Sequence, residues 1–282
     1  MTKIPCRMAA LDLDGTLLNS DHIVTDKNCT ALRELSKEGV VVVLVSGRMH
    51  QSILPISDQI GLENPIISYN GGLVKHAKTG EVFHHTPIAA TTAMDLVDYC
   101  DERGLHLNFC LDDQLYIRME NPWSELYMNR TGVRATAVGD LKKLTGGEPT
   151  KMQVLDTPEN VTRLLIEFQK DFGDRLYITR TQIEYIEFMN PKVSKGPALK
   201  ALAAKAGISM DLVVAFGDGY NDESMMDAAG YSIAMGNAVE ELKESADFIA
   251  ESNDVDGVAQ AVERLLLGGR TTFHGFDGDA RG

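Results

Sequence analysis

The chain has 282 residues, of which 44% are hydrophobic and 24% charged, which is enough for one large globular domain or two modest ones. Its formal net charge of −14 argues against nucleic acid or an anionic membrane surface as the partner. No apolar run approaches transmembrane length, and the 4 cysteines form no C-x-x-C pair. We expect a cytoplasmic protein with reduced thiols.

The first part of the chain alternates apolar strands with helices. Residues 8–11 predict a short strand, and residues 26–39 have helical spacing. Residues 40–45 form a valine-rich run that is too apolar for a strand with one wet face. A second helix up to Gly61 and a third strand at 65–69 follow. This alternation predicts a parallel sheet covered by helices.

The middle of the chain has a different pattern, with paired strands that look antiparallel. The expected elements are a hairpin at 73–85, a helix at 89–104, strands at 106–111 and 114–119, a helix from Pro122, a loop at 141–150, a strand at 152–155, a helix at 158–172, and strands at 176–181 and 184–188. These elements predict an α+β module inserted into the first domain.

The α/β alternation then returns. It comprises a helix at 196–206, strands at 212–216, 231–235 and 247–250, and a helix at 255–267. The fold class is therefore α/β with an inserted α+β domain. We predict a core domain of residues 1–84 and 190–270, an inserted domain of residues 85–189, and a disordered tail at 271–282.

Two aspartates lie where the first strand ends. Asp12 and Asp14 start on one side of the strand, and Gly15 breaks it. Carboxylates this close repel each other, so the pair is costly without a cation, a shared proton or a ligand. A solvated turn explains the short D-x-D-G pattern equally well, so other segments must decide between the two interpretations.

Polar residues at the other strand ends favour a site. In open α/β sheets, ligands bind outside the carboxyl ends of the strands, and a helix start favours an anion. Asp218 and Asp222 add carboxylates for a divalent cation. Ser46, Lys195 and Asn221 offer hydrogen-bond donors for phosphate oxygens. Taken alone, each of these residues also has an interpretation without a function, such as a solvated lysine or a turn at a strand end.

This ligand set suits Mg²⁺, because hard cations prefer oxygen ligands whereas zinc would favour His or Cys. The cation has a clear purpose. A carboxylate that attacks a phosphate is repelled by about 4 kcal/mol per pair of unit charges at ~4 Å and an effective dielectric of ~20. A metal ion and an ammonium group offset this repulsion.

The sequence resembles the haloacid dehalogenase superfamily of aspartate-nucleophile phosphotransferases in all four motifs. Residues 12–17 (DLDGTL) are similar to the first, and Ser46 fits the second. Residues 193–199 around Lys195 look like the Cof-type form of the third, and residues 217–222 (GDGYND) look like the fourth. The resemblance implies a Rossmann-like parallel-sheet core and an inserted type C2 cap, most similar to the C2B variety.

The resemblance also implies residue roles. Asp12 would attack phosphorus, and Asp14 would protonate the leaving oxygen and then activate water. Mg²⁺ would bind Asp12, the Asp14 carbonyl and Asp218, with Asp222 bound directly or through water. The phosphoryl group would bind Ser46, Lys195, Asn221 and the amides of Leu13 and Gly47.

Several further residues have two open interpretations. Arg48 could contact substrate or a local carboxylate, and Asn70 could contact substrate or cap a turn. His84 and His85 suggest a metal site less strongly than a hydrated hairpin end. In the insert, candidates for contacting the leaving group, each more often structural, are Tyr116, Arg118, Glu120, Trp123 and Arg180.

We therefore expect a Mg²⁺-dependent phosphatase, monomeric or homodimeric, that acts on small phosphorylated metabolites such as sugar phosphates. Its cap would close over the cleft during the reaction. One alternative is a phosphomutase, and another is a non-catalytic sensor of phosphorylated metabolites. The presence of both Asp12 and Asp14 argues against the sensor.

Overall fold

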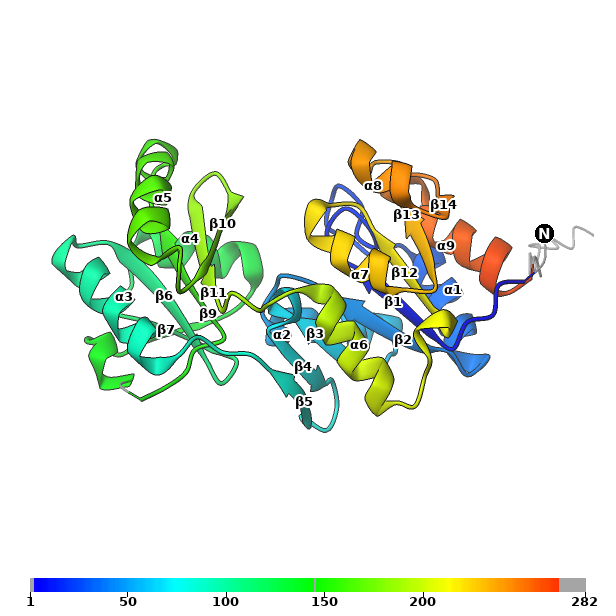
Figure 1. Ribbon diagram of the computed structural model, residues 1–282, viewed down its shortest axis with the longest axis horizontal. Coiled ribbons are helices and arrows are strands. Elements are labelled where there is room, and N and C mark those ends of the chain that lie inside the picture. Colours follow the sequence, from blue (N-terminus) through cyan, green and yellow to red (C-terminus); the bar gives the residue numbers. More distant parts are fainter. Residues whose placement is uncertain (1–2, 145, 269–282) are drawn as a thin grey trace, which may run out of the picture.

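The computed structural model describes residues 3–144 and 146–268. Figure 1 shows two lobes side by side, a core and an inserted cap domain. The chain passes between them twice. It leaves the core after strand β5 (Val82–His85) for helix α3 (Ala90–Glu102), and it returns after strand β11 (Tyr185–Met189) to helix α6 (Lys195–Lys205). The predicted tail at 271–282 lies outside the described residues.

The core contains a sheet of eight strands within the described residues, in the order β14-β13-β12-β1-β2-β3-β4-β5. The strands from β14 to β3 run parallel, and β4 and β5 add an antiparallel hairpin. Besides β5, the strands are β1 (Met8–Asp12), β2 (Val41–Val45), β3 (Pro65–Ser68), β4 (Leu73–His76), β12 (Val213–Gly217), β13 (Tyr231–Ala234) and β14 (Phe248–Ile249).

Helices cover both faces of this sheet. Successive side chains of a strand point to opposite sides, and here both sets are apolar and need burial. Ala9 and Leu11 of β1 face the helices α1 (Asp26–Lys37), α2 (His50–Ile60) and α9 (Gly257–Ala261). Met8 and Ala10 face α6, α7 (Glu223–Ala228) and α8 (Glu240–Ser245). The parallel strands are therefore buried on both sides, as their uniformly apolar sequences require.

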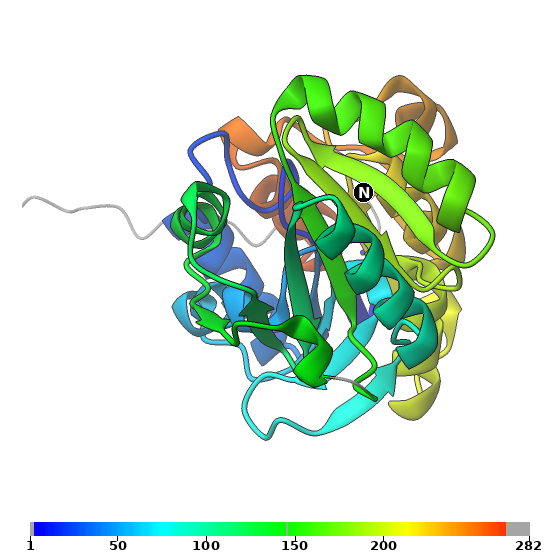
Figure 2. The ribbon, with the colours of Figure 1, turned by 90° about the vertical axis from the view of Figure 1, so that its left-hand side faces the viewer.

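The cap contains a second sheet, in the order β10-β11-β9-β6-β7-β8. Its strands are β6 (His106–Leu111), β7 (Gln114–Ile117), β8 (Ala135–Ala137), β9 (Lys151–Leu155), β10 (Tyr177–Gln182) and β11. Helices α3 and α5 (Pro158–Phe172) pack on its outer face, which Figure 2 turns toward the viewer. Its other face packs against α4 (Pro122–Thr131) and against the core.

Most predicted elements are present, and the inserted α+β module is confirmed. The exact domain boundaries stay a prediction. Some details differ. Tyr69 begins a 3₁₀ turn, residues 141–150 include the 3₁₀ turn Leu141–Leu144, and strand β8 was not predicted. The last helix starts at Gly257 and widens to a π-helical turn at Val262–Leu266. Across the described ranges, no helix is long and apolar enough to cross a membrane.

Candidate active site

The parallel order of the central strands brings three distant segments to one edge of the core sheet. Strand β1 pairs in parallel with β2 on one side and with β12 on the other. Asp12 ends β1, Ser46 follows β2 and Asp218 follows β12. The three side chains therefore leave the sheet at the carboxyl ends of neighbouring strands, where α/β proteins bind ligands.

Lys195 connects two of the predicted carboxylates. Its ammonium donates hydrogen bonds of 2.6 Å to Asp12 Oδ1 and to Asp222 Oδ1, and the lysine is fully buried. Burial by itself lowers the pKa of Lys195, but the two carboxylates outweigh it, so the pKa is raised and the side chain is charged. A buried cation is tolerated here because it is paired on two sides.

Asp218 and Asp222 are held in place by short-range hydrogen bonds. The second oxygen of Asp222 accepts the backbone N–H groups of Asp218 and Gly219, both at 3.0 Å. The Thr16 hydroxyl donates to Asp218 Oδ1 at 2.7 Å. Gly15 has a φ of +84°, and a Cβ there would lie 2.2 Å from Asp218 Oδ2, so the turn requires glycine.

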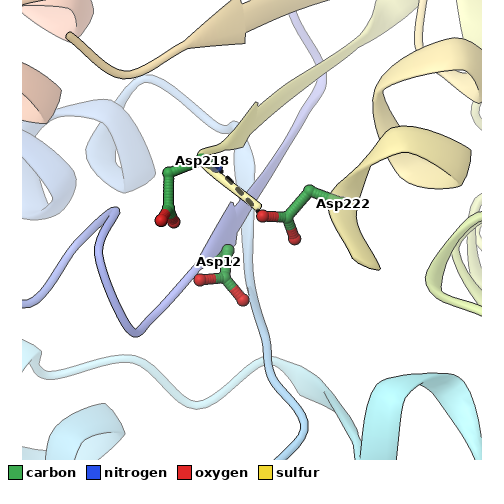
Figure 3. A group of neighbouring side chains, drawn as sticks. All are labelled: Asp12, Asp218 and Asp222. Atoms are coloured by element: carbon green, nitrogen blue, oxygen red, sulfur yellow. Dashed lines mark hydrogen bonds between the residues drawn. The ribbon is translucent and has the colours of Figure 1, made fainter. Parts of the chain in front are cut away.

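The three carboxylates fit a divalent cation. Figure 3 shows Asp12, Asp218 and Asp222 pointing into one space, and one oxygen of each lies within 4.8 Å of the others. Burial and the neighbouring Asp222 raise the pKa of Asp12 well above its ordinary value. Burial raises the pKa of Asp218 to about 6. Lys195 alone does not neutralise this cluster, whereas a divalent cation with oxygen ligands would.

Asp14 lies apart from this cluster. Arg48 Nε donates to Asp14 Oδ2 at 2.8 Å, and a second guanidinium nitrogen contacts the other carboxylate oxygen. Asp14 is exposed, unlike the buried Asp12. Of the two interpretations open for Arg48, the structure shows the contact with a local carboxylate. Asp12 and Asp14 thus have different environments.

The polar residues predicted to bind phosphate form a second group beside the carboxylates. The Ser46 hydroxyl accepts the Arg48 backbone N–H at 3.2 Å. Asn221 donates to Asn70 Oδ1 at 3.1 Å, and a Cβ on Gly47 would lie 3.0 Å from Asn70 Nδ2. Asn70 thus contacts both the segment after β2 and the segment after β12. It therefore lies beside the residues predicted to bind phosphate.

The remaining phosphate-binding candidate is the backbone amide of Leu13. The side chain of this leucine is fully buried in the core, between the two aspartates in sequence. Whether its amide contacts a phosphoryl group stays a prediction.

The other open candidates, apart from Glu120, contact other parts of the protein. His84 pairs with Thr86 and His85 with Thr150, at 2.8 and 2.9 Å. In the cap, Arg180 donates to the carbonyls of Gln182 and Ile183, and Arg118 forms an ion pair with Asp101. Tyr116 and Trp123 pack on apolar clusters, and Glu120 is exposed.

Two contacts at the site were not predicted. Thr16, known only as part of the first motif, orients Asp218, and the Asn237 amide donates to the Gly15 carbonyl at 2.7 Å. The composition of the D-x-D-G-T stretch signals Thr16, but nothing near Asn237 in the sequence links it to a segment more than two hundred residues away.

Comparisons with known proteins show the family of this chain. A family model described as haloacid dehalogenase-like hydrolase matches residues 9–262. The 5-amino-6-(5-phospho-D-ribitylamino)uracil phosphatase YwtE of Bacillus subtilis is 30% identical, with 92% of this chain and 98% of the relative covered.

Two solved structures have the same fold. The crystal structure of TM0651 from Thermotoga maritima is 30% identical, covers 92% of this chain and 97% of that one, and has a TM-score of 0.86. The subclass IIB sugar phosphatase BT4131 is 20% identical, with coverages of 93% and 98% and a TM-score of 0.73. The latter similarity shows the fold, including the C2 cap. The chain therefore belongs to the haloacid dehalogenase-like hydrolases, in the Cof-type group whose α/β core carries an inserted C2 cap.

Proposed function

We propose that this protein hydrolyses small phosphorylated metabolites through covalent catalysis by Asp12. It is a phosphatase of the haloacid dehalogenase family. The observation that carries the mechanism is the position of Asp12, which is buried at the end of β1 beside Asp218 and Asp222 and bonded to Lys195. Because burial and Asp222 raise the pKa of Asp12, a bound divalent cation together with Lys195 would keep its carboxylate ionised, and the ionised carboxylate is a competent nucleophile toward phosphorus.

The reaction has two steps. An Asp12 oxygen attacks phosphorus, the bond to the leaving oxygen breaks, and Asp14 gives that oxygen a proton. Asp14 then takes a proton from water, whose oxygen attacks the aspartyl-phosphate and regenerates the Asp12 carboxylate. The contacts of Arg48 with both oxygens of Asp14 would fix the position of this carboxylate.

The cofactor would be Mg²⁺, held by Asp12, Asp218 and the backbone carbonyl of Asp14. Asp222 would bind through a water molecule, since its oxygens already accept Lys195 and two backbone amides. The ion would supply charge neutralisation between the carboxylate and the phosphoryl oxygens. Ser46, Lys195, Asn221 and the amides of Leu13 and Gly47 would bind the transferred group.

We propose a sugar phosphate or sugar-alcohol phosphate as the substrate class. The relative YwtE is named as a phosphatase of a compound with a phosphorylated ribityl group, which supports a sugar-alcohol phosphate as the substrate class here. A phosphomutase would share the first step and pass the phosphoryl group to a second hydroxyl. Release of inorganic phosphate without an added phosphosugar activator distinguishes the phosphatase from the mutase.

The test is Asp12→Asn with p-nitrophenyl phosphate as the substrate. We expect loss of phosphate release by more than about a thousandfold while Mg²⁺ still binds, because a side-chain amide at this position cannot form the covalent intermediate. Treatment with EDTA should abolish the wild-type activity, and Mg²⁺ but not Ca²⁺ should restore it. Unchanged turnover in Asp12→Asn would refute the nucleophile.

A further inference from the structure

A lysine of the cap reaches into the core beside the predicted phosphate site. Lys151 begins β9, and it is 2% exposed. Its ammonium donates to Glu187 Oε1 at 2.9 Å and to the backbone carbonyl of Gly47 at 3.3 Å. The second contact crosses between the two domains and ends on the residue that follows Ser46. The proposed mechanism does not use this buried cation.

The lysine is anchored by a buried polar row on the inner face of the cap sheet. Gln153 donates to the same Glu187 oxygen at 2.8 Å and accepts from Asn108 at 3.2 Å. His106 continues the row through Asn108 at 3.0 Å. An apolar pair of similar volume would stabilise this interior as well as a buried ion pair does. The position of the ammonium against Gly47 therefore points to a functional role.

The Gly47 carbonyl belongs to the same peptide group as the Arg48 N–H. That N–H donates to the Ser46 hydroxyl oxygen at 3.2 Å. A hydrogen bond accepted by the carbonyl polarises the peptide group and strengthens its N–H as a donor. Because the Ser46 oxygen accepts this N–H, its own hydroxyl proton remains available to a phosphoryl oxygen.

We propose that Lys151 is a positioning residue that orients the Ser46 hydroxyl through the Gly47–Arg48 peptide group. The cap thereby takes part in phosphate binding without contacting the phosphate. This inference rests on the phosphate-binding role assigned to Ser46 in the proposed function.

The test removes both charges of the pair, so that neither is left buried alone. We compare wild type, Lys151→Met/Glu187→Gln, Ser46→Ala and the triple variant. Calorimetry with inorganic phosphate and Mg²⁺ measures affinity, and p-nitrophenyl phosphate gives kcat and KM. We expect each change to weaken phosphate binding by about 10- to 100-fold, with no further loss in the triple variant. Lys151→Arg should restore part of the affinity.

The matched control is Arg130→Met/Glu184→Gln, which removes an ion pair of 3.1 Å between α4 and the turn from β10 to β11 in the cap. We expect this control to bind phosphate like the wild type. Wild-type affinity in the Lys151 pair variant or in Ser46→Ala overturns the proposal, and so do losses that add in the triple variant. Calorimetry measures phosphate affinity without turnover. An active Asp12→Asn variant would therefore refute Asp12 as the nucleophile without changing the affinities that test the role of Lys151.

Discussion

At the scale of single residues, the site is an unbalanced cluster of charges. Asp12, Asp218 and Asp222 converge on one space, and Lys195 bonds to two of them. Burial raises the pKa of Asp218 to about 6, and burial together with Asp222 raises the pKa of Asp12. In the absence of a metal ion, the folded protein therefore favours protonation of this cluster, whereas a bound cation favours its ionised form.

This imbalance predicts an unusual dependence of metal-free stability on pH. Asp218 holds its proton up to about pH 6 when folded but releases it near 3.8 when unfolded. Its contribution to stability is therefore complete below about pH 4 and is lost as the pH rises through 6. Relative to Asp218→Asn, the free energy of unfolding of the wild type should rise by about 1–2 kcal/mol between pH 7 and pH 4.5, allowing for partial exposure.

Urea unfolding of both proteins in EDTA measures this difference. With Mg²⁺ in excess, the trend should reverse, because Mg²⁺ binds the ionised carboxylate and stabilises the folded state. Parallel pH profiles for wild type and Asp218→Asn in EDTA would show that the pKa of Asp218 is not raised.

Arg48 carries a second prediction at this scale. It holds both oxygens of Asp14, so Arg48→Gln should leave that carboxyl free to rotate and lower kcat for p-nitrophenyl phosphate by about 10- to 100-fold. Arg48→Lys should recover little, because an ammonium cannot form the paired contacts of a guanidinium. Arg163→Gln, which removes an ion pair with Glu167 on a cap helix, is the control and should have wild-type kcat. An Arg48→Gln enzyme with wild-type kcat would contradict this role.

At the scale of elements, the position of Lys195 depends on how closely α6 approaches α7. Gly196 lies next to the lysine, and a Cβ there would lie 2.1 Å from the Ser224 carbonyl oxygen. The Gly196 N–H and the Ser194 hydroxyl both bond to the Ser224 side chain, at 3.1 and 2.6 Å. The helix start is thus held against α7, which directs the ammonium to Asp12 and Asp222.

Gly196→Ala should therefore push α6 away from α7 and displace the Lys195 ammonium. A displacement of about 1 Å in a catalytic group can cost about a hundredfold in rate, so we expect a loss of kcat of that order. Gly207→Ala is the control, because Gly207 lies past the other end of the same helix and a Cβ there meets no atom within 4 Å. Its effect should be limited to stability, since its φ is +64°. Equal kcat in the two variants would refute the argument.

The elements also show what the sequence can predict. Strands β1, β2 and β12 were predicted because unbroken apolar runs need burial on both faces. Strand β8 was missed, because Ala135–Ala137 is only 3 residues long, too short for a pattern to stand out, and it forms by pairing with β7. Tyr69 was assigned to a strand on its composition, yet its φ is +52°, a conformation imposed by its surroundings.

At the scale of the whole molecule, the two sheets are joined by buried contacts near the site. The Tyr69 hydroxyl of the core donates to Asp113 Oδ1 in the cap at 2.9 Å. Burial raises the pKa of Asp113, and the Tyr69 hydroxyl and the N–H groups of His50 and Gln51, at the start of α2, oppose this shift only in part. An apolar cluster that includes Met49, Tyr69 and Leu155 crosses the same boundary. Such contacts join residues far apart in sequence, so no local pattern signals them.

These contacts predict that the turn between β6 and β7, which contains Asp113 and is called the cap turn below, unfolds locally together with the start of α2. Tyr69→Phe removes one donor from the buried Asp113 carboxylate and should lower stability by about 1–3 kcal/mol. Amide hydrogen exchange should become faster at the cap turn around Asp113 and at His50 and Gln51. Tyr99→Phe is the matched control, since Tyr99 packs on Phe168 and Phe172 within the cap, and it should leave exchange at both places unchanged. Faster exchange at the cap turn alone would mean that the two domains open independently.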